Sequence, residues 1–187
     1  SDYLTGLLNR QGFEAALDGR IAEADATGSE VACLFIDLDR FKAINDNLGH
    51  AAGDSVLRQF TQRLQPLIGK GDSISRLGGD EFAILVTGGA VQERAAALCD
   101  TVVNIFDLPF QAEGQHVRLS ASMGLAFYPL HADSAAELLQ KSDMAMYERK
   151  RDGKNGAQVF DPSILDRTRE RAEIESDIEA ALAARWF

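Results

Sequence analysis

Apolar residues recur at helical spacing in several parts of the chain. Phe13, Leu17 and Ile21 fall on one face of a helix, and with Ala16 and Ala24 they predict a helix over residues 13–24. Ser134, followed three residues later by Glu137, forms a capping box that predicts the start of another helix. The same reasoning predicts helices over residues 54–68, 91–106 and 134–151, a short helix over residues 39–47 that stops at Gly49, and a charged helix from Pro162 to the end.

Shorter apolar runs predict β-strands between these helices. Val31–Leu38 is almost wholly apolar, which is typical of a central strand. The runs 73–77 and 82–86 predict a hairpin, with residues 78–81 as its turn. Residues 115–128 predict a long strand region, with Gly124 as the candidate for a kink, and residues 158–160 a short strand. Hairpin strands pair antiparallel, so the pattern predicts an α+β fold with a mainly antiparallel central sheet flanked by helices.

Composition narrows the class of protein. The 187 residues suit one domain, 45% of them are apolar, and no window reaches the ~18 uninterrupted apolar residues that indicate a membrane span. The net charge of -10 argues against a nucleic-acid partner, although carboxylates that hold a divalent cation can still attract a phosphate. Cys33 and Cys99 lie in apolar runs, which predicts core residues in a reducing compartment and a cytoplasmic location. The first residue is Ser1, which predicts an excerpt of a longer parent that could be anchored to a membrane elsewhere.

Two pairs of acidic residues are candidates for a metal site. Asp37 and Asp39 stand two residues apart at the end of the central strand, so their side chains point the same way, and the alternative role is to cap the next helix. Asp80 and Glu81 lie in the hairpin turn after Gly78-Gly79, whose alternative role is only a tight turn. If the strands that end at Asp37 and Leu77 are neighbours, the two pairs converge into an oxygen-rich site suited to magnesium.

Further polar residues suit a nucleotide. Lys42 is a candidate to neutralise charge on a phosphate, or a solvated surface lysine. Asn45 and Asp54 are candidates to bind a guanine edge, or a turn residue and a helix N-cap. Lys150 and Lys154 belong to a basic cluster at a helix C-terminus, which either compensates the helix dipole or holds a triphosphate.

Together these segments resemble the GGDEF family of diguanylate cyclases. Residues 78–82 read Gly-Gly-Asp-Glu-Phe, the unbroken signature of that family. Residues 2–10 are similar to its opening DxLTGLxNR motif, residues 37–50 to its DxDxFKxxND…GH segment, and residues 143–155 to its closing DxALYxAKxxGRN motif. Four motifs in the family's order, spread over residues 2–160, make a chance resemblance negligible.

The resemblance implies a fold like the palm domain of adenylyl cyclases and polymerases, and the joining of two GTP molecules into cyclic di-GMP. It implies two Mg²⁺ or Mn²⁺ ions per active site and a homodimer, because each domain holds one GTP. By resemblance, Asp37, the Leu38 carbonyl, Asp80 and Glu81 are metal-site groups, and Asp80 is also the proposed general base. The implied catalytic residues are Asp80, Glu81 and Lys42; the implied substrate-binding residues are Asn45, Asp54, Gly78, Gly79, Lys150 and Lys154.

One implied site is degenerate. The product-inhibition motif of the family is RxxD, and the corresponding residues here are Gly69 to Asp72. Glycine cannot replace a bidentate guanidinium, so we expect weak or absent inhibition by cyclic di-GMP, with Lys70 as a partial substitute.

The end of the chain allows two interpretations. Residues 169–187 predict a charged helix with Ile174, Ile178, Ala181 and Leu182 on one face. This helix either packs on its own domain or connects it to a following domain. The segment 170–182 resembles the junction between GGDEF and EAL phosphodiesterase domains. We therefore expect a GGDEF domain over residues 1–160 and a linker or start of an EAL domain over 161–187, attached in a tandem parent.

Three functions follow from these residues. The first is an active diguanylate cyclase, favoured by the intact carboxylates and Lys42. The alternative is a catalytically weak GTP-binding domain that regulates an attached EAL phosphodiesterase. A dimerisation or docking domain is the third, and the unbroken signature makes it the least favoured. GTP affinity separates the third from the others, and turnover separates the first two.

Overall fold

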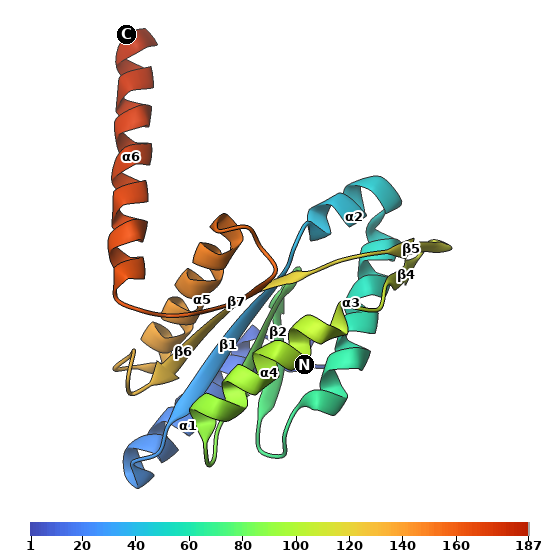
Figure 1. The fold of residues 1–187 in the computed structure, drawn as a ribbon, viewed down its shortest axis with the longest axis vertical. Helices are drawn as coiled ribbons and strands as arrows, with labels where there is room; N and C mark the ends of the chain where they lie inside the picture. The colour runs from blue at the N-terminus through green and yellow to red at the C-terminus, as the bar shows by residue number, and fades with distance from the viewer. Residues whose placement is uncertain (187) are drawn as a thin grey trace.

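The computed structural model describes residues 1–186 as a central sheet between two layers of helices, with one long helix projecting away (Figure 1). Five strands lie in the order β2-β3-β1-β6-β7, and β4 and β5 form a separate two-stranded sheet. The strands are β1 (Val31–Leu38), β2 (Ser73–Gly78), β3 (Glu81–Val86), β4 (Phe110–Ala112), β5 (Gln115–Val117), β6 (Ala121–Tyr128) and β7 (Gly156–Val159). The helices are α1 (Arg10–Thr27), α2 (Phe41–Leu48), α3 (His50–Leu64), α4 (Val91–Ile105), α5 (Ala135–Arg151) and α6 (Ser163–Trp186), with a 3₁₀ turn at Gln65–Leu67.

Strand β1 is apolar on both faces because both faces are covered. Leu34 and Ile36 belong to the core shared with α2, α3 and α4, whereas Cys33 and Phe35 belong to the core shared with α1 and α5. Alternate residues of a strand point to opposite faces, so the continuous apolar run of β1 serves both layers. Both cysteines are buried and free, as predicted from the sequence.

The prediction of an α+β fold with a mainly antiparallel sheet is confirmed. The pairs β1–β3, β1–β6 and β2–β3 are antiparallel, and only β6–β7 is parallel within the five-stranded sheet. Helix α5 connects β6 to β7, and such a crossover is what a parallel pair requires.

The prediction for residues 115–128 was wrong in two respects. Residues 115–117 pair with residues 110–112 in a separate hairpin, and the sheet strand begins only at Ala121. Gly124 lies inside the continuous β1–β6 ladder, with no shift of register. Its role is to admit α5: a Cβ there would lie 1.9 Å from the Ser142 carbonyl oxygen and 2.2 Å from the Met146 nitrogen.

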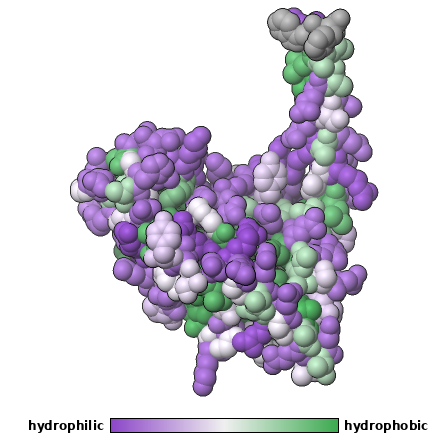
Figure 2. Space-filling view, turned by 180° about the vertical axis from the view of Figure 1, so that it is seen from behind, coloured by the Kyte–Doolittle hydropathy of each residue, from purple (hydrophilic) through white to green (hydrophobic). Residues whose placement is uncertain are grey.

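Helix α6 is attached to the domain at its base. Glu148 of α5, only 2% exposed, lies 2.8 Å from Arg167 Nε and 2.7 Å from Arg171 Nη2. Further along α6, Ile174, Ile178 and Leu182 are each more than half exposed, and polar and apolar side chains mix on the projecting part (Figure 2). Within residues 1–186, no helix combines the length and apolarity needed to cross a bilayer.

Candidate active site at the ends of strands β1 and β3

The two acidic pairs are brought together by the register of β1 and β3. Asp37 lies directly opposite Glu81 in this antiparallel pair, and directly opposed residues point to the same face. The Leu38 nitrogen lies 3.3 Å from the Asp80 carbonyl oxygen, which holds the turn against the end of β1. The strands that end at Asp37 and Leu77 are not neighbours, because β3 lies between them. The pairs therefore converge through the first residue of β3 and not through the end of β2.

Asp37 is held in an unusual electrostatic environment. Its Oδ2 lies 3.2 Å from Lys150 Nζ, while its Oδ1 is buried with no hydrogen-bond partner among the described residues. Burial, together with the neighbouring Asp80, raises the pKa of Asp37 to about 7, and Lys150 opposes this rise. Among the described residues, Lys150 is thus the cation that pairs with Asp37, whose second carboxylate oxygen is unsatisfied.

Glu81 has a similar but weaker perturbation. Burial raises its pKa first, and the charges of Asp143 and Asp80 add to the rise. Arg10, whose Nη2 lies 3.9 Å from Glu81 Oε2, and Lys150 act in the opposite direction. Both carboxylates that face each other across β1 and β3 are therefore destabilised in their charged form unless a cation joins them.

The residues at this site fit a divalent cation that prefers oxygen ligands. The buried, unpartnered Oδ1 of Asp37 is the group that such an ion would satisfy. Within residues 1–186, however, no three carboxylate, imidazole or thiol side chains are close enough to enclose an ion by themselves. A site of few side chains suits Mg²⁺, which keeps waters and binds substrate phosphates as further ligands.

Asp39 holds this region together and does not cap the next helix. It is 3% exposed, and its two oxygens accept hydrogen bonds from Ser120 Oγ and Ser122 Oγ, both at 2.6 Å. The backbone nitrogen of Asn155 also donates to it at 3.1 Å. The residue before α2 is Arg40, which makes no side-chain capping bond. Sequence reasoning missed the two serines, because their positions 81 and 83 residues away give no local signal.

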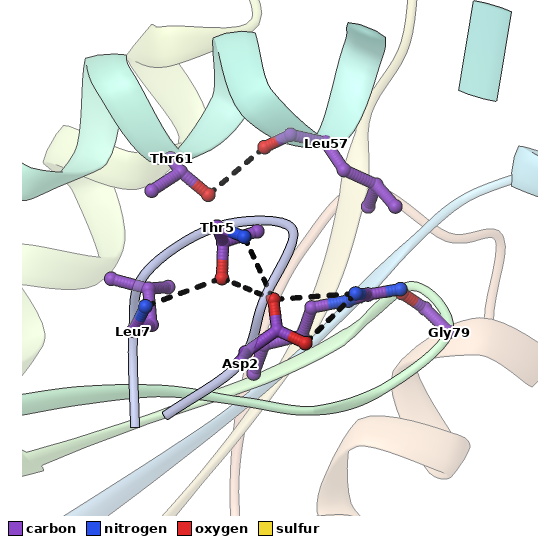
Figure 3. A network of polar contacts seen from close by, with 7 residues as sticks. Asp2, Thr5, Leu7, Leu57, Thr61 and Gly79 are labelled. Atoms are coloured by element: carbon purple, nitrogen blue, oxygen red, sulfur yellow. Dashed lines mark hydrogen bonds and ion pairs between the residues drawn. The ribbon is translucent and has the colours of Figure 1, made fainter. Parts of the chain in front are cut away.

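The hairpin turn is fixed by Arg76, which sequence reasoning also missed. Its Nε donates to the Gly79 carbonyl oxygen at 2.9 Å, and its Nη1 lies 3.1 Å from Asp2 Oδ1 (Figure 3). Asp2 in turn accepts hydrogen bonds from the nitrogen and hydroxyl of Thr5. Gly78 and Gly79 have φ values of 152° and 47°, which side-chain-bearing residues rarely adopt. The first motif of the chain therefore supports the turn that carries Asp80.

The two candidate guanine-binding residues lie on paired helices. Asn45 is inside α2, and Asp54 lies inside α3, which begins at His50, so neither is the turn residue or the N-cap of the alternative interpretation. The close contact of these helices depends on Gly53. A Cβ at that position would lie 1.9 Å from Asn45 Oδ1, so glycine leaves the space that the Asn45 amide occupies.

Of the three lysines that are candidates to hold phosphates, only one lies at the acidic centre. Lys150 is at the acidic centre, 3.2 Å from Asp37 and 4.0 Å from Asp39. Lys42 is exposed in the first turn of α2. Lys154 lies in the loop before β7 with a positive φ of 64° and has no ion pair in the described part of the chain.

The segment that we predict to be a degenerate inhibitory site is contacted by a residue of helix α4. Asp72 remains, and Arg94 of α4 places Nη2 2.8 Å from its Oδ2. A Cβ on Gly69 would lie 2.9 Å from Asp72 Oδ2 and 3.1 Å from Arg94 Nη2. Arg94, and not Lys70, is therefore the cation that stands beside Asp72.

Comparisons with known proteins agree with this geometry. Residues 1–156 match the family described as "Diguanylate cyclase, GGDEF domain". Diguanylate cyclase TpbB of Pseudomonas aeruginosa is 42% identical over 94% of this chain, and MucR of the same species, a bifunctional diguanylate cyclase/cyclic di-GMP phosphodiesterase, is 37% identical over 98%. The chain spans 40% of the length of TpbB and 27% of that of MucR.

Solved structures show the same fold. The isolated GGDEF domain of TpbB from Pseudomonas aeruginosa superposes with a TM-score of 0.86 at 39% identity, covering 90% of this chain and 98% of that one. The GGDEF domain of DgcB from Caulobacter crescentus, solved in complex with c-di-GMP, gives a TM-score of 0.78 at 29% identity, covering 85% of this chain and 92% of the other.

Proposed function

The chain belongs to the GGDEF family of diguanylate cyclase domains, and from this premise we propose that it condenses two GTP molecules into cyclic di-GMP. The observation that carries the proposal is the opposition of Asp37 and Glu81 across β1 and β3, with one buried Asp37 oxygen unsatisfied. Phosphoryl transfer needs positioning and charge neutralisation more than covalent chemistry from the protein, and these carboxylates would hold the cation that provides the neutralisation.

Asp37, the Leu38 carbonyl, Asp80 and Glu81 would hold Mg²⁺ or Mn²⁺, two ions per active site. When bound, such ions neutralise charge on the phosphates and on the attacking oxygen. The raised pKa of Asp37 and of Glu81 supports this assignment, because a nearby positive charge stabilises the charged form of both carboxylates.

The other residues would orient the substrate. Asn45 and Asp54 bind the guanine edge between α2 and α3, while Gly78 and Gly79 let a phosphate approach the backbone of the turn. Lys42, Lys150 and Lys154 hold the phosphates. Because Lys150 contacts Asp37 in the free protein, it would leave that carboxylate for a phosphate when substrate and metal arrive.

The reaction needs two copies of the domain. In each half-reaction the 3′-hydroxyl oxygen of one GTP forms a bond to the α-phosphorus of the other, and the bond to the β-phosphate oxygen breaks to release pyrophosphate. Asp80 accepts the hydroxyl proton. Since each domain holds one GTP, two domains must face each other across a two-fold axis.

Turnover is the test of this function. The purified chain at high concentration is incubated with GTP and Mg²⁺ or Mn²⁺, and cyclic di-GMP is measured by mass spectrometry. We expect product, a rate that rises faster than linearly with protein concentration, and loss of product in Asp80→Ala. Absence of product from a chain that binds GTP would contradict the proposal.

One observation favours a second function, a GTP-binding domain that regulates an attached EAL phosphodiesterase. Helix α6 is fixed by two arginines to Glu148, two residues before Lys150 on the same helix. Occupancy of the nucleotide site could therefore change the direction of α6 in a tandem parent, and the cytoplasmic part of that parent would carry both domains. GTP binding without turnover, with activation of a covalently attached phosphodiesterase, would support this alternative.

A further inference from the structure

A concentration of positive charge lies beside the acidic centre. A cavity of about 280 Å³ is lined by the basic residues Arg40, Arg118 and Lys154 and by one acidic residue, Asp39. The whole chain carries a net charge of -10, so three cations around one cavity make a local field opposite in sign to that of the molecule. Such a cavity attracts anions.

Three segments that are distant in sequence build this cavity, and Asp39 joins them. The carboxylate of Asp39 accepts hydrogen bonds from Ser120 Oγ in the second segment and from the Asn155 nitrogen in the third. Both of these bonds go to Oδ2, and Oδ1 accepts a hydrogen bond from Ser122 Oγ, so both Asp39 oxygens are satisfied within the protein. Lys150 lies 4.0 Å from Oδ1. The negative charge of Asp39 is compensated at the back of the cavity, while the basic side chains remain around it.

Most of the basic groups are not used by the fold. Within residues 1–186, the side chains of Arg40 and Lys154 make no ion pair or hydrogen bond. Arg118 places one terminal nitrogen 3.4 Å from the Asp107 carbonyl oxygen, which leaves its other donors without a protein partner in that part of the chain. These donors are available to a ligand.

The backbone around the cavity is held in a costly conformation. Arg40, Lys154 and Asn155 have φ values of 59°, 64° and 51°, and they are three of the five non-glycine residues with positive φ in the described chain. Left-handed backbone at residues with side chains concentrates at ligand sites, where it directs polar groups toward the ligand in a way that a relaxed loop would not.

From these observations we infer that Arg40 and Arg118, together with Lys154, bind the terminal phosphates of the GTP substrate and the pyrophosphate that leaves. The inference rests on the proposed function for the identity of the ligand, whereas the cavity and its charges are independent of it. Arginine forms paired, planar hydrogen bonds to phosphate that lysine cannot form, so these two residues add orientation to the charge of Lys154. Lys150, in the last turn of α5, lies between this loop and Asp37 in sequence and pairs with Asp37.

Binding of pyrophosphate tests the inference without requiring turnover. Pyrophosphate, GMP and inorganic phosphate are titrated separately into the 187-residue chain by calorimetry in the presence of Mg²⁺. We expect Arg40→Gln and Arg118→Gln each to weaken pyrophosphate binding by about fivefold or more, as loss of a charge-assisted hydrogen bond implies. GMP affinity should stay unchanged, and Arg58→Gln, an exposed arginine of α3, should leave all three titrations as in the wild type.

Three results of these titrations decide between the inference and its alternatives. Pyrophosphate affinity within twofold of the wild type in both variants, in folded protein, would overturn the inference. Weakened binding of inorganic phosphate with unchanged pyrophosphate would also overturn it, since the cavity would then be a general anion site. If pyrophosphate binding weakens as expected in a chain that makes no cyclic di-GMP, the cavity assignment stands and the proposed cyclase activity fails.

Discussion

Lys150 Nζ lies 3.2 Å from Asp37 Oδ2, so a side chain assigned to the substrate neutralises a side chain assigned to the metal. The pair is mostly buried, with side-chain exposures of 24% and 14%. Removing Lys150 leaves Asp37 close to Asp80 with no ion-pair partner among the described residues. In Lys150→Met we expect the free energy of unfolding without divalent metal to fall by about 1 to 2 kcal/mol, less than for a fully buried pair.

Mg²⁺ should reverse this loss, because a cation at Asp37 replaces the missing ammonium group. The measurement is urea denaturation with and without Mg²⁺, with exposed Lys70→Met as the matched control. Equal stability of Lys150→Met and wild type without metal, or a gap that Mg²⁺ does not narrow, would show that Lys150 does not have this role.

The acidic residues could be selected as candidates from the sequence because they are close in sequence to strong local signals. Asp37 lies near the end of an apolar strand, and Asp80 and Glu81 come directly after two glycines. What could not be predicted was strand order: β3, and not β2, pairs with β1, since strand order depends on the packing of the whole sheet. Asp39 was likewise misassigned because its partners, Ser120 and Ser122, come from a distant strand.

We expect Gly53 to position Asn45, one of the two residues proposed to bind guanine. A methyl group there would lie 1.9 Å from Asn45 Oδ1, so Gly53→Ala should force the Asn45 amide to another rotamer. We expect KM for GTP to rise about tenfold, the cost of about one hydrogen bond, with kcat nearly unchanged. Alanine is the better helix former, so stability should not fall by more than about 1 kcal/mol.

Steady-state kinetics of Gly53→Ala, Asn45→Ala and the double variant separate this explanation from a general disturbance of α3. If Gly53 acts through Asn45, the double variant is little worse than Asn45→Ala alone. Independent, additive effects of the two substitutions would refute the explanation.

Two glycines provide a matched test of packing between sheet and helix. At Gly124 a methyl group would meet the backbone of α5 at 1.9 Å and 2.2 Å, and backbone atoms cannot rotate away. Gly124→Ala should therefore lose at least about 3 kcal/mol of the free energy of unfolding. Gly19→Ala, on the exposed face of α1 with nothing within 4 Å, should gain about 0.5 to 1 kcal/mol. Urea denaturation of both variants checks the pair, and similar stabilities would refute the assigned contact.

The same glycine explains a failed prediction of the fold. The sequence predicted a kink at Gly124, because glycine weakens the interior of a strand. The reason that glycine is needed there, that α5 crosses β6 at that residue, is visible only in the tertiary structure. Local chemistry identified the residue, and packing decided its role.

The ion pair beside Gly69 bears on inhibition by cyclic di-GMP. Asp72 is paired with Arg94, and the space beside Gly69 is filled by that ion pair. We expect weak inhibition of the wild type by cyclic di-GMP and no gain from Gly69→Arg alone, because the new side chain would meet Arg94. Gly69→Arg combined with Arg94→Ala should strengthen inhibition by about tenfold or more, the value of a charge-assisted hydrogen bond to the ligand.

Arg94→Ala alone is the matched control: it frees Asp72 but supplies no guanidinium at residue 69, so it should leave inhibition weak. Inhibition is measured by titrating cyclic di-GMP into the turnover assay, and calorimetry of the same variants reports binding directly. Strong inhibition of the wild type that disappears in Asp72→Ala would contradict the prediction, because Asp72 would then bind product despite its contact with Arg94. Restored inhibition in Gly69→Arg alone would mean that Arg94 moves aside. The missing arginine at residue 69 would then explain the weak inhibition of the wild type, and the Asp72–Arg94 ion pair would not.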